Sequence, residues 1–251
     1  MKAIILAAGY ATRLYPLTLS VPKPLLPICG KPLIDYILDK IGELDCVDTV
    51  YAVTNHKFAA AFYDWERKRE SGRGGKPVVI LDDGTEDEAS RLGAIGDINF
   101  VIERERIDDD LLIIAGDNMF TYSLKNCAAF FEKTGDCIVA KEIEDIEILK
   151  SVAVAALGPD GLVLDLIEKP AVPASRFGIF ATYFYRRETL PLFRQYLEAG
   201  NKPDAPGYFV QWLYKRKPVY AWIMDGECYD IGTPKAYEEI QEIFKPKCAK
   251  I

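Results

Sequence analysis

The sequence predicts an α/β protein with a mainly parallel, doubly wound central sheet and helices on both of its faces. Short apolar runs of strand length alternate with longer segments whose apolar residues recur at helical spacing. The first run, residues 2–8, is apolar almost throughout, which is typical of a strand covered on both faces. The chain has 251 residues, of which 49% are hydrophobic, so it can bury a sizeable core.

The first half predicts four strands and four helices in alternation. Strands are expected at residues 2–8, 49–54, 77–81 and 111–115, and helices at residues 32–44, 56–70, 94–106 and 123–134. Ser123 is the expected N-cap of the last helix. Ligands of such sheets bind beyond the carboxyl ends of the strands, so the loops 8–24, 82–93 and 116–118 are expected to converge.

After residue 136 the pattern changes to strands joined by hairpin-like links. Strands are expected at residues 137–141, 152–157, 162–168, 179–185 and 219–224, and helices at residues 188–199, 208–215 and 234–244. The sequence Gly158-Pro159-Asp160-Gly161 is typical of a hairpin turn. Because no Ser/Gly-rich linker divides the chain, we expect one domain over 1–251, with halves at 1–135 and 136–251.

Composition narrows the classes of function. The 38 acidic and 31 basic residues give a formal net charge of −7, which disfavours nucleic acid as a main partner but allows a small phosphorylated ligand. The single histidine, His56, excludes mechanisms that need several imidazoles. Six scattered cysteines, an N-terminal apolar run too short for a signal peptide, and the lack of a membrane-length apolar stretch predict a cytoplasmic protein.

The segment after the first strand, LAAGYATRLYPLTLSVPKPLLP over residues 6–27, carries the strongest functional signal. Residues 7–9 lack bulk where the strand ends, so a flat ligand or a phosphate can approach the backbone. Arg13 offers a guanidinium fork for phosphate oxygens, and Lys23 is a cation between two prolines that restrict its backbone. Each residue alone is most simply an ordinary loop residue. Their combination favours a phosphate site, although neither GxxxxGKS/T nor GxGxxG is present.

Two aspartates are candidates for holding a divalent cation. Asp117 directly follows the strand expected at 111–115, where a carboxylate can hold Mg²⁺ beside phosphates. Asp230 precedes the last helix, in the sequence Tyr229-Asp230-Ile231-Gly232-Thr233-Pro234. Considered alone, both are more simply turn or helix-start residues, and Thr233 is an equal candidate for the N-cap.

Residues 6–27 resemble the nucleotide-binding motif of the sugar-1-phosphate nucleotidylyltransferases, which include the glucose-1-phosphate thymidylyl- and uridylyltransferases. The resemblance implies a glycosyltransferase-A-like nucleotidyltransferase fold, Rossmann-like, with a small β-rich extension that binds the sugar. It implies nucleotide binding by Leu6, Ala7, Ala8, Gly9, Arg13 and Gly93. It also implies catalytic roles for Arg13 on pyrophosphate oxygens, for Lys23 on the transferring phosphates and for Asp117, which would share Mg²⁺ with Asp230.

Two later features agree with this resemblance, and two depart from it. Glu168 and Lys169 match the E-K-P motif of the family, in which the glutamate takes sugar hydroxyls and the lysine meets the sugar phosphate. Ala11 stands where the motif usually has glycine, and Ala153 stands where a sugar-contacting glycine is expected. The loop 82–96 is expected over the base, although its acidic part is as typical of a flexible loop.

The resemblance predicts transfer of a nucleotidyl group from an NTP to a sugar 1-phosphate with release of pyrophosphate and with Mg²⁺ as the cofactor. The favoured substrates are dTTP or UTP and glucose 1-phosphate. Because a phosphate monoester is already a nucleophilic anion, this chemistry needs no general base, and His56 is expected to be a helix-start or surface residue. The expected partners are the two substrates, without nucleic acid or membrane, and the oligomeric state stays open.

Three alternatives remain at this stage. The first is a cytidylyltransferase that acts on phosphocholine. The Glu168-Lys169 pair favours a sugar substrate over phosphocholine. The second is a non-catalytic homologue that binds nucleotide or sugar nucleotide and regulates a partner. The third is a Rossmann dehydrogenase, which the missing GxGxxG disfavours. About 20 residues follow Asp230, so we expect no appended acyltransferase domain.

Overall fold

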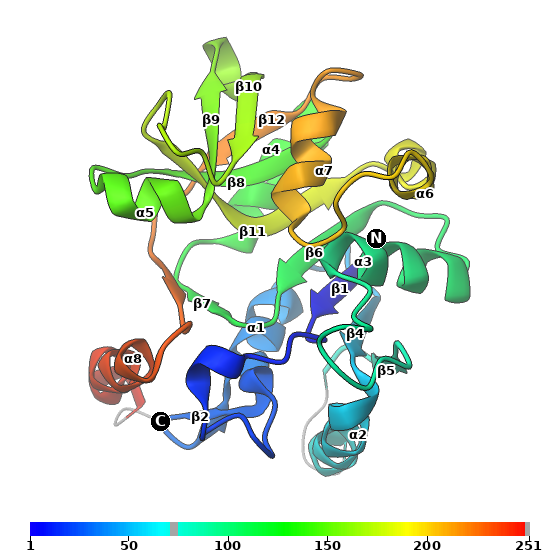
Figure 1. Cartoon of the computed structure of the whole chain (residues 1–251), viewed down its shortest axis with the longest axis vertical. Coiled ribbons are helices and arrows are strands. Elements are labelled where there is room, and N and C mark those ends of the chain that lie inside the picture. The colour runs from blue at the N-terminus through cyan, green and yellow to red at the C-terminus, as the bar shows by residue number, and fades with distance from the viewer. Residues whose placement is uncertain (71–74, 249–251) are drawn as a thin grey trace.

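A single sheet runs through both halves of the chain (Figure 1). The structure is a computed structural model that describes residues 1–70 and 75–248, and within these residues the sheet has nine strands. Its parallel part has the order β6-β1-β4-β5. These strands are β1 (Lys2–Leu6), β4 (Thr49–Thr54), β5 (Val78–Asp82) and β6 (Leu111–Ala115). The predicted mainly parallel sheet is therefore confirmed.

The second half continues the same sheet with mostly antiparallel pairs. The long strand β11 (Phe177–Tyr185) pairs antiparallel with β6 and thereby joins the two halves. The remaining strands are β8 (Cys137–Glu142), β9 (Ala153–Leu157), β10 (Val163–Glu168) and β12 (Tyr220–Ile223). The expected hairpin at 158–161 connects β9 to β10, with Asp160 at φ 58° and Gly161 at φ 81°.

Helices cover both faces of the sheet, as the alternating strands require. Along β1, Ile5 packs into the core on one face and Ile4 into the core on the other. The first face is covered by α1 (Leu33–Gly42), α2 (His56–Glu70) and α4 (Leu124–Thr134). The second is covered by α3 (Ala94–Arg104), α6 (Pro191–Glu198) and α7 (Pro206–Leu213).

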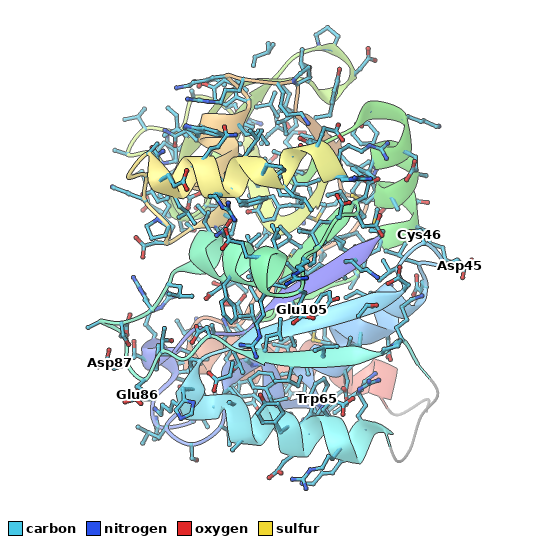
Figure 2. All side chains as sticks on the ribbon, turned by 90° about the vertical axis from the view of Figure 1, so that its right-hand side faces the viewer. Asp45, Cys46, Trp65, Glu86, Asp87 and Glu105 are labelled. Carbon is cyan, nitrogen blue, oxygen red and sulfur yellow. The ribbon has the colours of Figure 1, made fainter. Side chains whose placement is uncertain are left out.

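Local signals in the sequence explain several helix boundaries. Ser123 caps α4, because its Oγ accepts a hydrogen bond from the Asn126 amide at 3.3 Å. The helix expected from residue 188 begins at Pro191, after a short 3-10 turn over Arg187–Thr189. Trp65 on α2 turns toward the sheet, and its Nε1 donates to Asp35 Oδ1 on α1 at 3.1 Å (Figure 2). Among the residues described, no helix combines the length and apolar character needed to cross a membrane.

Several short elements have no counterpart in the sequence prediction. The pairs β2 (Pro27–Ile28) with β3 (Lys31–Pro32), and β7 (Asn118–Phe120) with β13 (Cys228–Asp230), form two small separate sheets. The helix α5 (Ile146–Ser151), which precedes β9, was not predicted either, whereas α8 (Pro234–Cys248) confirms the helix expected at residues 234–244. Strands of two or three residues are too short to show an alternating pattern. The β7–β13 pair nevertheless matters most, because it carries Asp230 to the edge of the main sheet.

Candidate functional site

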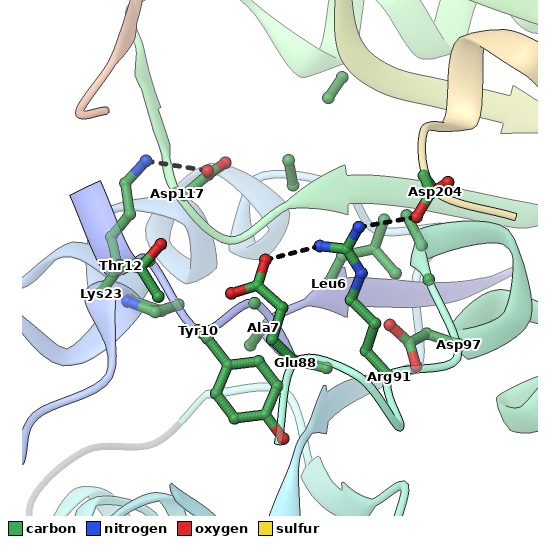
Figure 3. A pocket seen from close by; sticks show the side chains of 18 of the residues that line it. Leu6, Ala7, Tyr10, Thr12, Lys23, Glu88, Arg91, Asp97, Asp117 and Asp204 are labelled. Carbon is green, nitrogen blue, oxygen red and sulfur yellow. Dashed lines mark hydrogen bonds and ion pairs between the residues drawn. The ribbon is translucent and has the colours of Figure 1, made fainter. Parts of the chain in front are cut away.

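The carboxyl ends of the parallel strands open onto a cavity of about 440 Å³ (Figure 3). Its lining comes from residues 6–14, 83–94 and 115–117, so the predicted convergence of the three loops is confirmed. The cavity is also lined by Asp204, just before α7, by Pro206, the first residue of α7, and by Gly232. No sequence motif had predicted that these two segments would reach the site.

Lys23 lies at one end of this cavity and joins two carboxylates. It begins a 3-10 turn, Lys23–Leu25, between Pro22 and Pro24, and only 5% of the residue is exposed. Its Nζ donates to Asp117 Oδ2 at 2.9 Å and to Asp230 Oδ1 at 3.0 Å. The ammonium therefore balances both charges, and the structure brings together three residues predicted from separate motifs.

Backbone geometry explains how the two aspartates meet. Asp117 follows Gly116, whose amide donates to the Leu6 carbonyl at 2.8 Å. A Cβ at Gly116 would lie 2.7 Å from that carbonyl oxygen, so only glycine fits between β6 and β1. Asp230 pairs with Asn118 in the β7–β13 ladder and so lies beside Asp117. Asp230 does not cap α8, because Thr233 Oγ1 accepts from the Ala236 amide at 3.1 Å and fills that role.

The loop after β1 holds Arg13 at the same end of the cavity. Ala11 adopts the left-handed conformation, with φ 48° and ψ 42°, and starts the 3-10 turn Thr12–Leu14. This conformation is the physical reason why glycine is usual at that position. Arg13 is exposed, and no described residue pairs with it. Its Nη2 would lie 3.5 Å from a Cβ built on Gly232, next to Asp230.

The six residues predicted to bind the nucleotide all line the cavity. Leu6, Ala7, Ala8 and Gly9 form part of its wall. Apart from its two chain neighbours, no described residue has an atom within 4 Å of the position that a Cβ on Gly9 would take, so this position faces open space. This small-residue floor leaves room for a flat ligand beside the backbone.

Gly93 lines the opposite end and is fixed there by a close approach of the chain. It has φ +79°, and a Cβ would lie 2.7 Å from the Pro203 carbonyl oxygen. The same oxygen accepts from the Ile95 amide at 2.8 Å. The predicted site residue Gly93 is therefore held against the segment before α7 by a contact that only glycine permits.

A second pair of acids, Asp83 and Asp97, lies at this end and was missed by the sequence analysis. Asp83 Oδ1 accepts from the Thr85 amide and hydroxyl, both at 2.7 Å. Asp83 Oδ2 and Asp97 Oδ1 are buried and have no other hydrogen-bond partner among the described residues. Burial, followed by the charge of Asp83 and a hydrogen bond to it, raises the pKa of Asp97 to about 8. One signal was available: Asp97 stands among the buried apolar positions Ile95, Ile98 and Val101 of α3.

Arg91 connects two walls of the cavity. Its Nη1 lies 3.0 Å from Glu88 Oε1 in the same loop, and its Nη2 lies 2.9 Å from Asp204 Oδ1 in the segment before α7 (Figure 3). The loop tip with Glu86 and Asp87 projects away from the sheet (Figure 2). Arg91, the cation near Asp83 and Asp97, is thus already paired with Glu88 and Asp204.

The second half adds a smaller adjoining cavity of about 200 Å³ that also contacts Asp117 and Asp230. Glu168 lines it, and burial raises the pKa of this carboxyl. A Cβ at Gly207 would lie 1.8 Å from Glu168 Oε2 and 3.0 Å from the Cβ of Ala153. The lack of a side chain at Gly207 therefore leaves space for the Glu168 carboxylate. The methyl group of Ala153 borders the same space.

Two residues from the sequence analysis lie outside these cavities. Lys169 is exposed, has φ 48° and lines neither of them. His56 is exposed at the start of α2, and its Nδ1 lies 2.6 Å from Asp82 Oδ2, which raises the pKa of the imidazole. The prediction that His56 is a helix-start surface residue is confirmed.

The two carboxylates of Asp117 and Asp230 fit a Mg²⁺ ion that also binds substrate phosphates and water. They fit less well a metal ion whose ligands all come from the protein. The described residues contain no group of three or more His, Cys, Asp or Glu side chains that could enclose a metal. Mg²⁺ is commonly held by one or two carboxylates, with substrate phosphates and water completing its shell. Two partly exposed carboxylates at the edge of a cavity match that pattern.

Comparison with known proteins gives a family match over nearly the whole chain. Residues 2–245 match the family described as Nucleotidyl transferase. A glucose-1-phosphate thymidylyltransferase of Mycobacterium tuberculosis is 32% identical over 215 residues, which cover 83% of this chain and 67% of that protein. A mannose-1-phosphate guanyltransferase of Candida glabrata is 28% identical over 240 residues, covering 94% of this chain and 63% of its own length.

A solved UDP-glucose pyrophosphorylase complexed with UDP-glucose has the same fold. It superposes with a TM-score of 0.80 at 21% identity, and the match covers 98% of each chain. At this identity the likeness bears on the fold alone. Against several curated relatives the chain spans only 52% to 63% of their length.

Proposed function

The chain belongs to the nucleotidyl transferase family, and we propose that it transfers a nucleotidyl group from an NTP to a sugar 1-phosphate and releases pyrophosphate. The observation that carries this proposal is Lys23 between Asp117 and Asp230, at the junction of the two cavities. The larger cavity accommodates the nucleotide and the smaller one the sugar phosphate. The reaction would take place where they meet.

In the proposed reaction an oxygen of the sugar phosphate attacks the α-phosphorus of the NTP in line. Because this oxygen is already anionic, the protein's task is to position two anions and to balance their charge. Lys23 attracts the two phosphates to one point. Arg13, which is exposed and has no partner among the described residues, is available for the leaving pyrophosphate.

Asp117 and Asp230 are the proposed ligands of Mg²⁺. When bound, the ion would neutralise charge on the phosphates. Lys23 contacts both carboxylates in the structure, so the ammonium must shift toward the phosphates as the substrates and the ion bind. Its side chain has the freedom for such a shift, whereas the clamping prolines hold its backbone.

For the substrates we propose dTTP or UTP and glucose 1-phosphate. Glu168 supports a sugar, because its half-buried carboxyl can hydrogen-bond to hydroxyl groups in the smaller cavity. Lys169 would meet the sugar phosphate only if its exposed side chain turns toward that cavity. We further propose that residues 1–251 act as one catalytic unit in which both halves contribute to the site.

The test is an assay of pyrophosphate release with Mg²⁺, each NTP and a panel of sugar 1-phosphates, with phosphocholine as the rival acceptor. Asp117→Ala is expected to lower the rate on the order of 10²-fold or more. The matched control is Asp45→Ala, since Asp45 is exposed at the opposite end of the sheet (Figure 2). Turnover of phosphocholine alone would favour the cytidylyltransferase, and no turnover with any pair would favour a binding protein.

A further inference from the structure

We propose that Asp83 and Asp97 form a carboxyl pair that selects the base of the nucleotide. The pair favours a base that presents an N–H donor beside a carbonyl group, as uracil, thymine and guanine do, over adenine and cytosine. This inference rests on the proposed function, because it takes the ligand of the larger cavity to be a nucleotide.

The cavity has two chemically different ends (Figure 3). Lys23 and Asp117 lie at the end where phosphates would bind. Asp97 lies at the other end (Figure 3), with Asp83 beside it and with its amide donating to the Gly93 carbonyl at 2.8 Å. A nucleotide with its phosphates at Lys23 therefore extends its base toward the acid pair.

The geometry of the pair defines what it offers to a ligand. Asp83 is held by Thr85, and its free oxygen Oδ2 is buried, as is Asp97 Oδ1. Two buried acceptors next to each other are stable only if they share a proton, and the raised pKa of Asp97 agrees with this. With that proton donated to Asp83, Asp97 keeps its second oxygen as an acceptor on the cavity wall.

An acceptor at this position discriminates between bases by hydrogen bonding. Uracil and thymine present N3–H, and guanine presents N1–H, to a group that faces their Watson–Crick edge. Adenine N1 and cytosine N3 are acceptors and would leave the Asp97 oxygen unpaired. The Gly93 amide lines the same end and donates to no described residue, so it can serve the neighbouring carbonyl of the base.

The surroundings give no structural reason for this acid pair. The helix α3, which carries Asp97, packs against β1, β4 and α7 in an apolar cluster that includes Ile4, Val53 and Phe209. The charged or titratable groups that share this end of the cavity are Tyr10, Asp83, Glu88, Arg91 and Asp204, and Arg91 is paired with Glu88 and Asp204. A buried acid without a cation lowers stability, so its presence in a cavity indicates a role in binding.

The experiment compares five NTPs with the wild type and with variants Asp97→Asn and Asp97→Ala. Equilibrium binding is measured without sugar phosphate, and kcat/KM is measured with it. The wild type should prefer UTP, dTTP or GTP over ATP and CTP by about 100-fold or more. Asp97→Ala should reduce this preference at least about 10-fold, because it weakens the binding of the preferred NTP. Glu86→Gln, an exposed change in the same loop, is the control and should leave the preference unchanged.

Asp97→Asn keeps the test decisive if the alanine variant does not fold. Its amide can donate to Asp83 and still present a carbonyl oxygen, so it imitates the protonated acid. The affinity of the wild type for the preferred NTP should fall as the pH rises from 7 to 9, whereas that of Asp97→Asn should not. The inference is overturned by equal base preference in the wild type and Asp97→Ala, or by the same pH profile in the wild type and Asp97→Asn. Base-selective binding without turnover would instead contradict the proposed reaction while supporting the acid pair.

Discussion

Two pairs of aspartates lie at opposite ends of the site that the two cavities form, and their surroundings give them different chemistry. Asp117 and Asp230 have 43% and 59% of their side chains exposed and share the Lys23 ammonium. Asp97 is 6% exposed, and Asp83 is held by Thr85, but neither acid has an ion-pair partner among the described residues. The comparison shows that burial and the nearest cation, rather than residue type, decide whether a carboxylate can hold a metal ion or share a proton.

Removal of the divalent cation is expected to have the largest effect on activity. This effect should be confined to the end of the site where Asp117 and Asp230 lie. If Asp117 and Asp230 hold Mg²⁺, excess EDTA should abolish pyrophosphate release, and added Mg²⁺ should restore it. Binding of the base at the acid pair should persist in part, measurable as displacement of a fluorescent nucleotide. Full activity in EDTA would contradict the metal assignment.

Replacement of the shared cation is expected to have the next largest effect. Lys23→Met keeps the buried stem of the side chain and removes the charge that attracts two anions. Its kcat/KM should fall on the order of 10²-fold, with the base preference unchanged. Lys125→Met, an exposed substitution on α4, is the control for loss of one positive charge. A changed base preference in Lys23→Met would mean that the two ends do not act separately.

The raised pKa of Asp97 predicts that the stability of the protein depends on pH. The pKa of Asp97 is raised from 3.8 in an unfolded chain to about 8, so the folded state binds the proton more tightly. The free energy of unfolding should therefore decrease as the pH rises between about 4 and 8, because the unfolded state loses its proton first. At roughly 1.4 kcal/mol for each pKa unit, and allowing for relaxation of a buried site, the decrease from pH 5 to pH 8 should be about 2–4 kcal/mol.

Urea unfolding at pH 5 and pH 8 measures this decrease. Asp97→Asn should remove most of it, because an amide does not titrate. The difference between the wild type and the variant isolates Asp97 from other titrating groups, including Glu168, whose pKa is also raised by burial. A variant with the same pH dependence as the wild type would show that Asp97 is ionised in the folded protein.

The sequence predicted the two ends of the cavity to different extents. Arg13, Lys23 and Asp117 belong to local motifs at strand ends, so their positions follow from the parallel sheet alone. Asp230 reaches Asp117 through β13, a strand of three residues that shows no alternating pattern. Asp97 lies in the first turn of a helix, where an aspartate is usually exposed and interacts with the helix dipole. Its burial depends on contacts such as Ile95 with Pro203, about a hundred residues later, which no local pattern encodes.

The smallest predicted effect concerns the turn that presents Arg13. Ala11 has a left-handed backbone, which costs a non-glycine residue about 1–2 kcal/mol, while glycine adds about 0.5–1 kcal/mol of entropy to the unfolded chain. Ala11→Gly should therefore raise the free energy of unfolding by up to about 1 kcal/mol. Ala60→Gly, at an exposed position in α2, should lower it by about 0.5–1 kcal/mol. The same substitution should thus have opposite signs at the two positions. A loss of stability in both variants would mean that the left-handed turn is not strained, and that the alanine in this motif makes contacts which offset its conformation.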